Sequence, residues 1–188
     1  MGLRPARACP PVLRWLCIAA ASLAPFSAAA QTAVTTFGST DASKCYENAE
    51  NALSRDIAPC DRALGDRTAP RADRMKTFVN RGIIHNRNGA PQIAIDDFNA
   101  ALAIDPNLPE AYLNRGNSYF LIGLHDDALA DYEQALALDV KEPWSAHYNM
   151  GLVHDVKKQP DKAREAYQKA VDAKPDFIAA QRKLEGRS

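Results

Sequence analysis

Apolar residues recur every three or four positions along most of the chain, the spacing that places side chains on one face of an α-helix. Short polar turns and prolines interrupt this pattern from residue 75 onward, as at Asp105-Pro106 and Lys174-Pro175. A residue before proline is pushed out of the helical region, so these pairs mark the ends of units. The pattern predicts an all-α protein. The predicted helices cover residues 75–88, 91–103, 109–122, 125–138, 144–157, 160–173 and 176–186.

The helices repeat as pairs with a period of about 34 residues. Glycines in the first helix of each pair are 34 and 35 residues apart, at Gly82, Gly116 and Gly151. An alanine follows each glycine by 12 residues, then an aromatic residue four positions later and another alanine three positions after that. The aromatic residues are Phe98, Tyr132 and Tyr167. Such a fixed period indicates stacked helical hairpins that share one core.

These residues resemble the tetratricopeptide repeat family over residues 75–177. The resemblance implies a right-handed superhelical stack of helix-turn-helix repeats with a C-terminal capping helix. It places the repeats at 75–108, 109–142 and 143–175, and the capping helix at 176–188.

The N-terminus has the pattern of a secretory signal peptide. Arginines precede an apolar run that begins at Trp15, and small residues follow at Ser27-Ala28-Ala29-Ala30. The run is too short to span a bilayer. We therefore expect residues 1–30 to be removed after Ala30 and the protein to be periplasmic or secreted, with a flexible stretch at 31–41. A retained membrane anchor and a lipoprotein are the alternatives.

Residues 42–74 show the repeat pattern only weakly. The sequence Cys60-Asp-Arg-Ala-Leu64 aligns with the second helices of the later copies, which indicates a degenerate hairpin or cap followed by a linker. A turn near 53–56 would bring Cys45 opposite Cys60. Disulfides form in the exported compartment, so we predict a bond between these cysteines, with about 3 kcal/mol of stabilisation.

Composition narrows the range of functions. The chain has 23 basic and 23 acidic residues, which argues against a nucleic-acid partner. No serine or cysteine has a histidine at a recognisable motif spacing, and no glycine-rich phosphate loop is present. We therefore expect no enzyme, cofactor, metal or small-molecule substrate. His147 and His154 are the only candidates for a metal pair, and their spacing favours packed histidines instead.

Charges covary between the two helices of each repeat. Arg81 accompanies Asp97 and Arg115 accompanies Asp131, whereas the third copy has Met150 and an alanine at these positions. Because the positions lie roughly opposite each other in a hairpin, we predict two ion pairs, each contributing at most about 1 kcal/mol. The alternative is that the arginines are displayed for an acidic ligand.

Asparagine occupies the same position in the first helix of each copy, at Asn80, Asn114 and Asn149. Resemblance to family members with an asparagine ladder implies that these side chains face a concave groove and grip a peptide backbone. An amide both donates and accepts hydrogen bonds, so such a grip would not depend on the ligand's sequence. The alternatives are a surface asparagine copied by duplication and one that bonds the neighbouring helix.

Other groove candidates lie beside or one turn from the asparagines. They are Ile83, Leu113, Asn117, Phe120, Tyr148 and Leu152. This surface has no basic cluster, so the family's clamp for terminal carboxylates is absent. The sequence thus favours a non-catalytic adaptor of the cell envelope that binds a peptide or protein segment in the groove. The alternative is a structural subunit that assembles through its convex or terminal faces.

Overall fold

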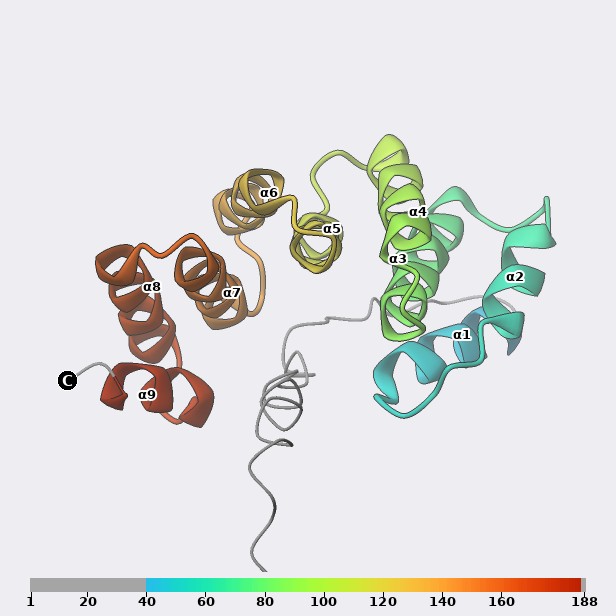
Figure 1. Cartoon of the computed structure of the whole chain (residues 1–188). Helices are drawn as coiled ribbons and strands as arrows, with labels where there is room; N and C mark the ends of the chain where they lie inside the picture. The colour runs from blue at the N-terminus through green and yellow to red at the C-terminus, as the bar shows by residue number, and fades with distance from the viewer. Residues whose placement is uncertain (1–39, 187–188) are drawn as a thin grey trace, which may run out of the picture.

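The computed structural model describes residues 40–186, which form helices joined by short turns and contain no strand. The helices are α1 (Thr40–Glu50), α2 (Ala58–Gly65), α3 (Arg71–Arg87), α4 (Pro91–Ile104), α5 (Pro109–Leu121), α6 (His125–Ala137), α7 (Pro143–Val156), α8 (Pro160–Ala173) and α9 (Ile178–Glu185). They follow one another along an arc, with α5 and α7 inside and α6 and α8 outside (Figure 1). The predicted all-α repeat stack is therefore confirmed.

Helices α4 to α8 begin and end within one residue of the predicted bounds and α9 within two, but the starts of α1 and α3 differ from the prediction. Helix α3 begins at Arg71 inside the predicted linker, because Pro70 ends the loop and the polar residues after it contain no helix breaker. Thr40 and Asp41 belong to α1 although 31–41 was expected to be flexible. Asp41 lies in the first helical turn and pairs with Arg62 on α2 at 2.9 Å.

The predicted signal peptide at 1–30, and the rest of the stretch up to residue 39, lie outside the described residues. Between residues 40 and 186, no helix combines the length and the apolar character needed to cross a membrane.

The two helices of each repeat can approach closely because a glycine on the first helix faces an aromatic ring on the second. A Cβ atom at Gly82 would lie 2.7 Å from the ring of Phe98, and one at Gly116 would lie 2.7 Å from the ring of Tyr132. Both rings are completely buried, so they cannot swing into solvent to make room. The glycine therefore fixes the distance between the paired helices, and the third repeat uses the same arrangement.

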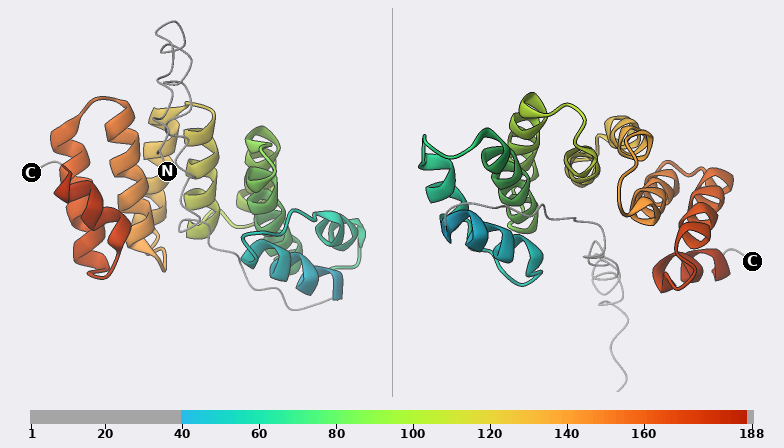
Figure 2. Two further views of the ribbon diagram at one scale, coloured as in Figure 1. Left: turned by 60° about the horizontal axis from the view of Figure 1, so that its bottom comes forward. Right: turned by 180° about the vertical axis from the view of Figure 1, so that it is seen from behind.

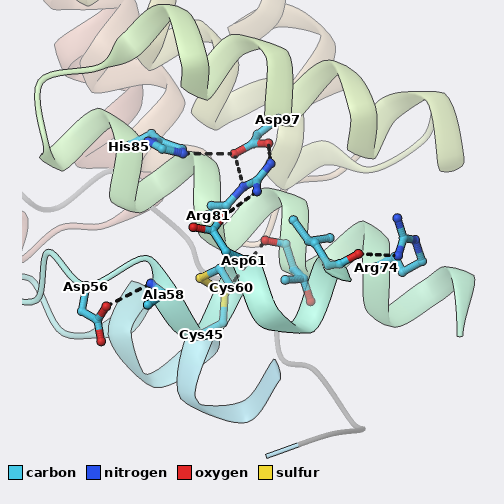
Figure 3. Close-up of polar contacts among 11 residues, drawn as sticks. Cys45, Asp56, Ala58, Cys60, Asp61, Arg74, Arg81, His85 and Asp97 are labelled. Atoms are coloured by element: carbon cyan, nitrogen blue, oxygen red, sulfur yellow. Dashed lines mark hydrogen bonds and ion pairs between the residues drawn. A yellow bond between two sulfur atoms is a disulfide. The ribbon is translucent and has the colours of Figure 1, made fainter. Parts of the chain in front are cut away.

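The N-terminal hairpin α1–α2 is closed by the predicted disulfide. The sulfur atoms of Cys45 and Cys60 lie at bonding distance, with their Cα atoms 4.8 Å apart (Figure 3). Both cysteines are fully buried and pack in one cluster with Val79 and Ile83 of α3. The hairpin thus extends the core of the first repeat and covers the first end of the stack.

Arg87, at the end of α3, holds the end of α1 in place. Its Nη1 donates to the carbonyl oxygens of Asn48, Asn51 and Ser54 at 2.8–2.9 Å, and its Nη2 donates to that of Ala49 at 2.7 Å. The last carbonyls of a helix have no partner within the helix, and a cation suits the negative end of its dipole. One side chain therefore caps α1 and docks the hairpin.

Candidate interaction surface

The inner side of the arc is formed by the sides of α5 and α7 that turn away from α6 and α8. The right-hand view of Figure 2 shows the arc from behind. Gly116 and Gly151 mark the outward sides of these helices, because they contact rings on α6 and α8. A helix turns by about 100° per residue. A residue five positions after the glycine therefore points about 140° away from the outer helix.

That position holds Leu121 on α5 and Val156 on α7. Leu121 is 43% exposed and Val156 is 53% exposed, which is unusual for large apolar side chains. Leu152, next to Gly151, is half-buried on the same side of α7. We call Leu121, Leu152 and Val156 the inner face.

Leu152 was among the residues predicted from the sequence, whereas Leu121 and Val156 were missed. The signal that could have found them is their shared position, five residues after the repeat glycine.

The three predicted groove asparagines turn to the same side of their helices but are buried there, which corrects the sequence interpretation. Asn80 and Asn114 are completely buried, and Asn149 is 2% exposed. Asn114 Nδ2 donates to the carbonyl oxygen of Glu110, one turn earlier in its own helix, at 2.8 Å. With almost no accessible surface, the amides cannot contact a ligand in this conformation.

The reason for this burial is a set of polar contacts between successive inner helices. Asn149 Nδ2 on α7 donates to Asn117 Oδ1 on α5 at 2.8 Å, and the same oxygen accepts from the Tyr132 hydroxyl at 3.0 Å. Ser118 on α5 donates to Asn86 Oδ1 on α3 at 2.9 Å. The bond from Asn149 to the neighbouring helix is one of the alternatives that the sequence left open. These amides fix the spacing of the repeats.

Most of the other predicted groove residues are buried as well. Ile83, Leu113 and Asn117 have no exposed surface, and Tyr148 is 8% exposed. They pack inside the stack, as Tyr148 does against Phe177, the residue before α9, at a ring-centroid distance of 5.1 Å.

Phe120 is half-buried, and its ring centroid lies 5.7 Å from that of His125. Of the predicted set, only Leu152 and Phe120 have substantial exposed surface.

The two predicted ion pairs are present. Arg81 donates to Asp97 through Nε at 3.0 Å and Nη2 at 2.7 Å, and Arg115 donates to Asp131 at 2.8 Å through both Nε and Nη2 (Figure 3 shows the first pair). The hydrogen bond to Asp131 raises the pKa of Arg115, while burial raises the pKa of the Asp131 carboxyl. The Arg81 and Arg115 side chains are only 23% and 19% exposed. They connect the helices of a repeat.

Histidines occupy structural positions in this stack. Burial lowers the pKa of His147, with a smaller effect from the nearby Lys169. His154 Nδ1 lies 2.9 Å from Gln159 Oε1. Within residues 40–186, histidine, cysteine and acidic side chains form no cluster of three that could hold a metal ion.

Known families match the repeated part of the chain. A model described as "Tetratricopeptide repeat" matches residues 113–176, and one described as "TPR repeat" matches residues 92–123. Residues 92–176 are therefore similar to tetratricopeptide repeats. The matched residues include Gly116, Gly151 and the aromatic residues that the repeat glycines face in all three hairpins.

Among solved structures, this chain is similar to the crystal structure of MamA, with 29% identity and a TM-score of 0.60. That match covers 70% of this chain and 76% of MamA. The first TPR domain of Spaghetti (RPAP3), solved with the HSP90 peptide SRMEEVD, shares the fold at 21% identity and a TM-score of 0.56. The match covers 60% of this chain and 88% of that domain.

A curated relative is the small glutamine-rich tetratricopeptide repeat-containing protein 2 of Mycosarcoma maydis. It is 31% identical over 110 residues, which is 58% of this chain. The chain spans only 30% of the length of that protein.

Proposed function

We propose that this protein is a non-catalytic adaptor that binds an extended segment of another protein along its inner face. The observation that carries the proposal is the exposure of Leu121 and Val156, at 43% and 53%, at corresponding positions of α5 and α7. Apolar side chains on a concave surface lose contact with water when a partner covers them. The RPAP3 domain with its HSP90 peptide supports peptide binding as a use of this fold.

The chemistry of this face favours apolar side chains of the ligand. Because the asparagine amides are already engaged within the stack, the ligand backbone would not be held by an amide ladder. Ordering an extended segment also costs conformational entropy, so a short stack should bind with moderate affinity.

The proposed setting is the cell envelope. Its support is the sequence of residues 1–30, with arginines, an apolar run and a small-residue cleavage site. The disulfide between Cys45 and Cys60 is consistent with an oxidising compartment.

A second candidate function is that of a structural subunit in an envelope complex. The observation that favours it is the exposure of large apolar residues away from the inner face. Ile93 on α4 is 51% exposed, and Ile122 and Leu124 in the α5–α6 turn are 37% and 46% exposed. A subunit assembling through its outer helices or hairpin tips would bury these residues instead.

Substitution of matched apolar residues distinguishes the two functions. A partner isolated from the cell envelope is titrated against wild type, Val156→Ser and Ile93→Ser, since these two side chains have almost equal exposure. Covering half of a valine contributes about 1 kcal/mol, so Val156→Ser should weaken binding about fivefold if the ligand lies on the inner face. Ile93→Ser should then leave the affinity unchanged. The reverse result would favour the structural subunit.

A further inference from the structure

A second concave site lies at the first end of the stack, where α1, α2 and the beginning of α3 meet. It is a cleft of about 120 Å³. Its lining residues are Ala42, Ala63, Asp66, Thr68, Ala69, Pro70, Asp73, Arg74 and Thr77. None of them belongs to the inner face, so the cleft is independent of the function proposed above.

Asp73 is the unusual residue in this cleft. It is only 8% exposed, yet its carboxylate makes no hydrogen bond or ion pair within residues 40–186. Only its backbone carbonyl is used, as the acceptor for the Thr77 hydroxyl at 2.7 Å. The small accessible surface of Asp73 opens into the cleft, and a carboxylate in such a position pairs favourably with a cation that enters it. The beginning of α3 offers a favourable dipole, while the neighbouring Arg74 donates to backbone carbonyls instead of to this carboxylate.

The other charged residues of the cleft are already engaged. Asp66 Oδ1 accepts from the backbone nitrogen of Thr68 at 2.9 Å and from its hydroxyl at 2.7 Å. Arg74 Nη1 donates to the carbonyl oxygens of Leu64 at 2.8 Å and Asp66 at 3.2 Å (Figure 3 shows the first). Two carboxylates and one guanidinium leave the lining with an excess of one negative charge. A ligand with a single positive charge would neutralise it.

We propose that this cleft binds the ammonium group of a lysine side chain from a partner protein. The ammonium would pair with Asp73, and the methylene groups of the lysine would pass between Ala42, Ala63 and Ala69 at the walls. A lysine ammonium is compact and has three donors, which suits a small cleft better than the planar guanidinium of arginine. Residues 15–39 contain no lysine, arginine or histidine, so this stretch of the chain supplies no cationic side chain to the cleft.

The disulfide holds the walls of the cleft in place. Ala42 is three residues before Cys45 on α1, and Ala63 is three residues after Cys60 on α2, so each wall lies one helical turn from a bonded cysteine. Cys45 Sγ also lies 4.0 Å from the carbonyl oxygen of Thr77, which lines the cleft. Lysine binding should therefore weaken when the disulfide is reduced.

The test is an NMR titration of the full oxidised chain with Nα-acetyl-lysine N-methylamide. The uncharged Nα-acetyl-norleucine N-methylamide serves as the matched probe. The lysine compound should shift the amide signals of Thr68, Asp73 and Thr77 in a saturable way, and the norleucine compound should not. Asp73→Asn should raise Kd about tenfold, the size expected for one charge-assisted hydrogen bond. The control Asp127→Asn removes an exposed carboxylate from the first turn of α6 and should leave Kd unchanged.

Ala69→Leu gives a second variant that narrows the cleft while leaving the carboxylate in place, and it decides the outcome if Asp73→Asn does not fold. It should also weaken lysine binding. Equal shifts with both probes, shifts confined to residues outside the cleft, or an unchanged Kd in the folded variants would overturn the proposal. Because the probe is a single amino-acid derivative, the result does not depend on whether the inner face binds a partner.

Discussion

Replacing Asn149 by alanine tests whether this residue belongs to the core or to a ligand site. The substitution removes the 2.8 Å hydrogen bond to Asn117, which is worth about 1 kcal/mol between neutral groups. Asn117 Oδ1 keeps the Tyr132 hydroxyl as a donor, so the loss leaves no unpaired acceptor there. Truncating a side chain that is 2% exposed also leaves a small void, adding about 1 kcal/mol. We expect a loss of about 2 kcal/mol in the free energy of unfolding.

Urea denaturation followed by circular dichroism at 222 nm measures this loss, provided that the slope with denaturant stays unchanged. In a double-mutant cycle with Asn117→Ala, the coupling energy should be about 1 kcal/mol. Asn107→Ala provides the control, because this asparagine is exposed in the turn before α5 and should change stability by less than about 0.5 kcal/mol. If Asn149→Ala leaves stability unchanged but abolishes binding to a partner, the assignment of Asn149 to the core is refuted.

Three further predictions concern charged groups. Arg87→Ala should destabilise the α1–α2 hairpin by about 3 kcal/mol, because four carbonyl groups lose a cationic donor. Hydrogen exchange of the α1 amides should then become faster. The control Arg71→Ala removes one exposed hydrogen bond of 3.5 Å and should not change this exchange. A double-mutant cycle on Arg115 and Asp131 should give a coupling energy of about 1 kcal/mol, and zero would contradict the pair. His147 has a lowered pKa when folded, so protons bind the unfolded chain more strongly and stability should fall as the pH drops below about 6.5. In denaturation experiments, the His147→Phe variant should lose less stability than the wild type between pH 7.5 and 5.5. An equal loss of stability in both proteins would show that His147 is not the cause.

The hairpins could be predicted from the sequence because one local rule determines them. A glycine that faces an aromatic ring recurs at a fixed spacing. The large ring fits between the helices only because glycine has no side chain at the facing position. Gly82 with Phe98 and Gly116 with Tyr132 follow this rule directly. The ion pair between Arg115 and Asp131 followed from the same register, since both residues keep a constant distance from these positions.

Burial along the inner helices could not be predicted in this way. Asn149 and Val156 are seven residues apart, so they lie on nearly the same side of α7, yet one is 2% exposed and the other 53%. The difference lies along the helix axis, because packed helices cross at an angle and are close only near the crossing. Asn149 reaches Asn117 of α5, whereas Val156 ends the helix and remains exposed.

The cleft around Asp73 was likewise hidden from sequence reasoning. Its walls come from α1, α2 and the loop before α3, segments in which the repeat pattern is weak. Asp73 itself lay within the predicted linker, where an acidic residue is unremarkable. Only the packing of three separate segments reveals that this carboxylate is buried.

Site-specific photo-crosslinking tests the central claim most directly, because it reports which surface a partner covers in the cell. A photoreactive phenylalanine derivative is placed at Val156 on the inner face or at Ile93 on the outer helix α4, two positions of matched exposure. The account predicts a crosslinked partner from position 156 and none from position 93. Crosslinking from position 93 alone would contradict it and move the interface to the outer side of the arc.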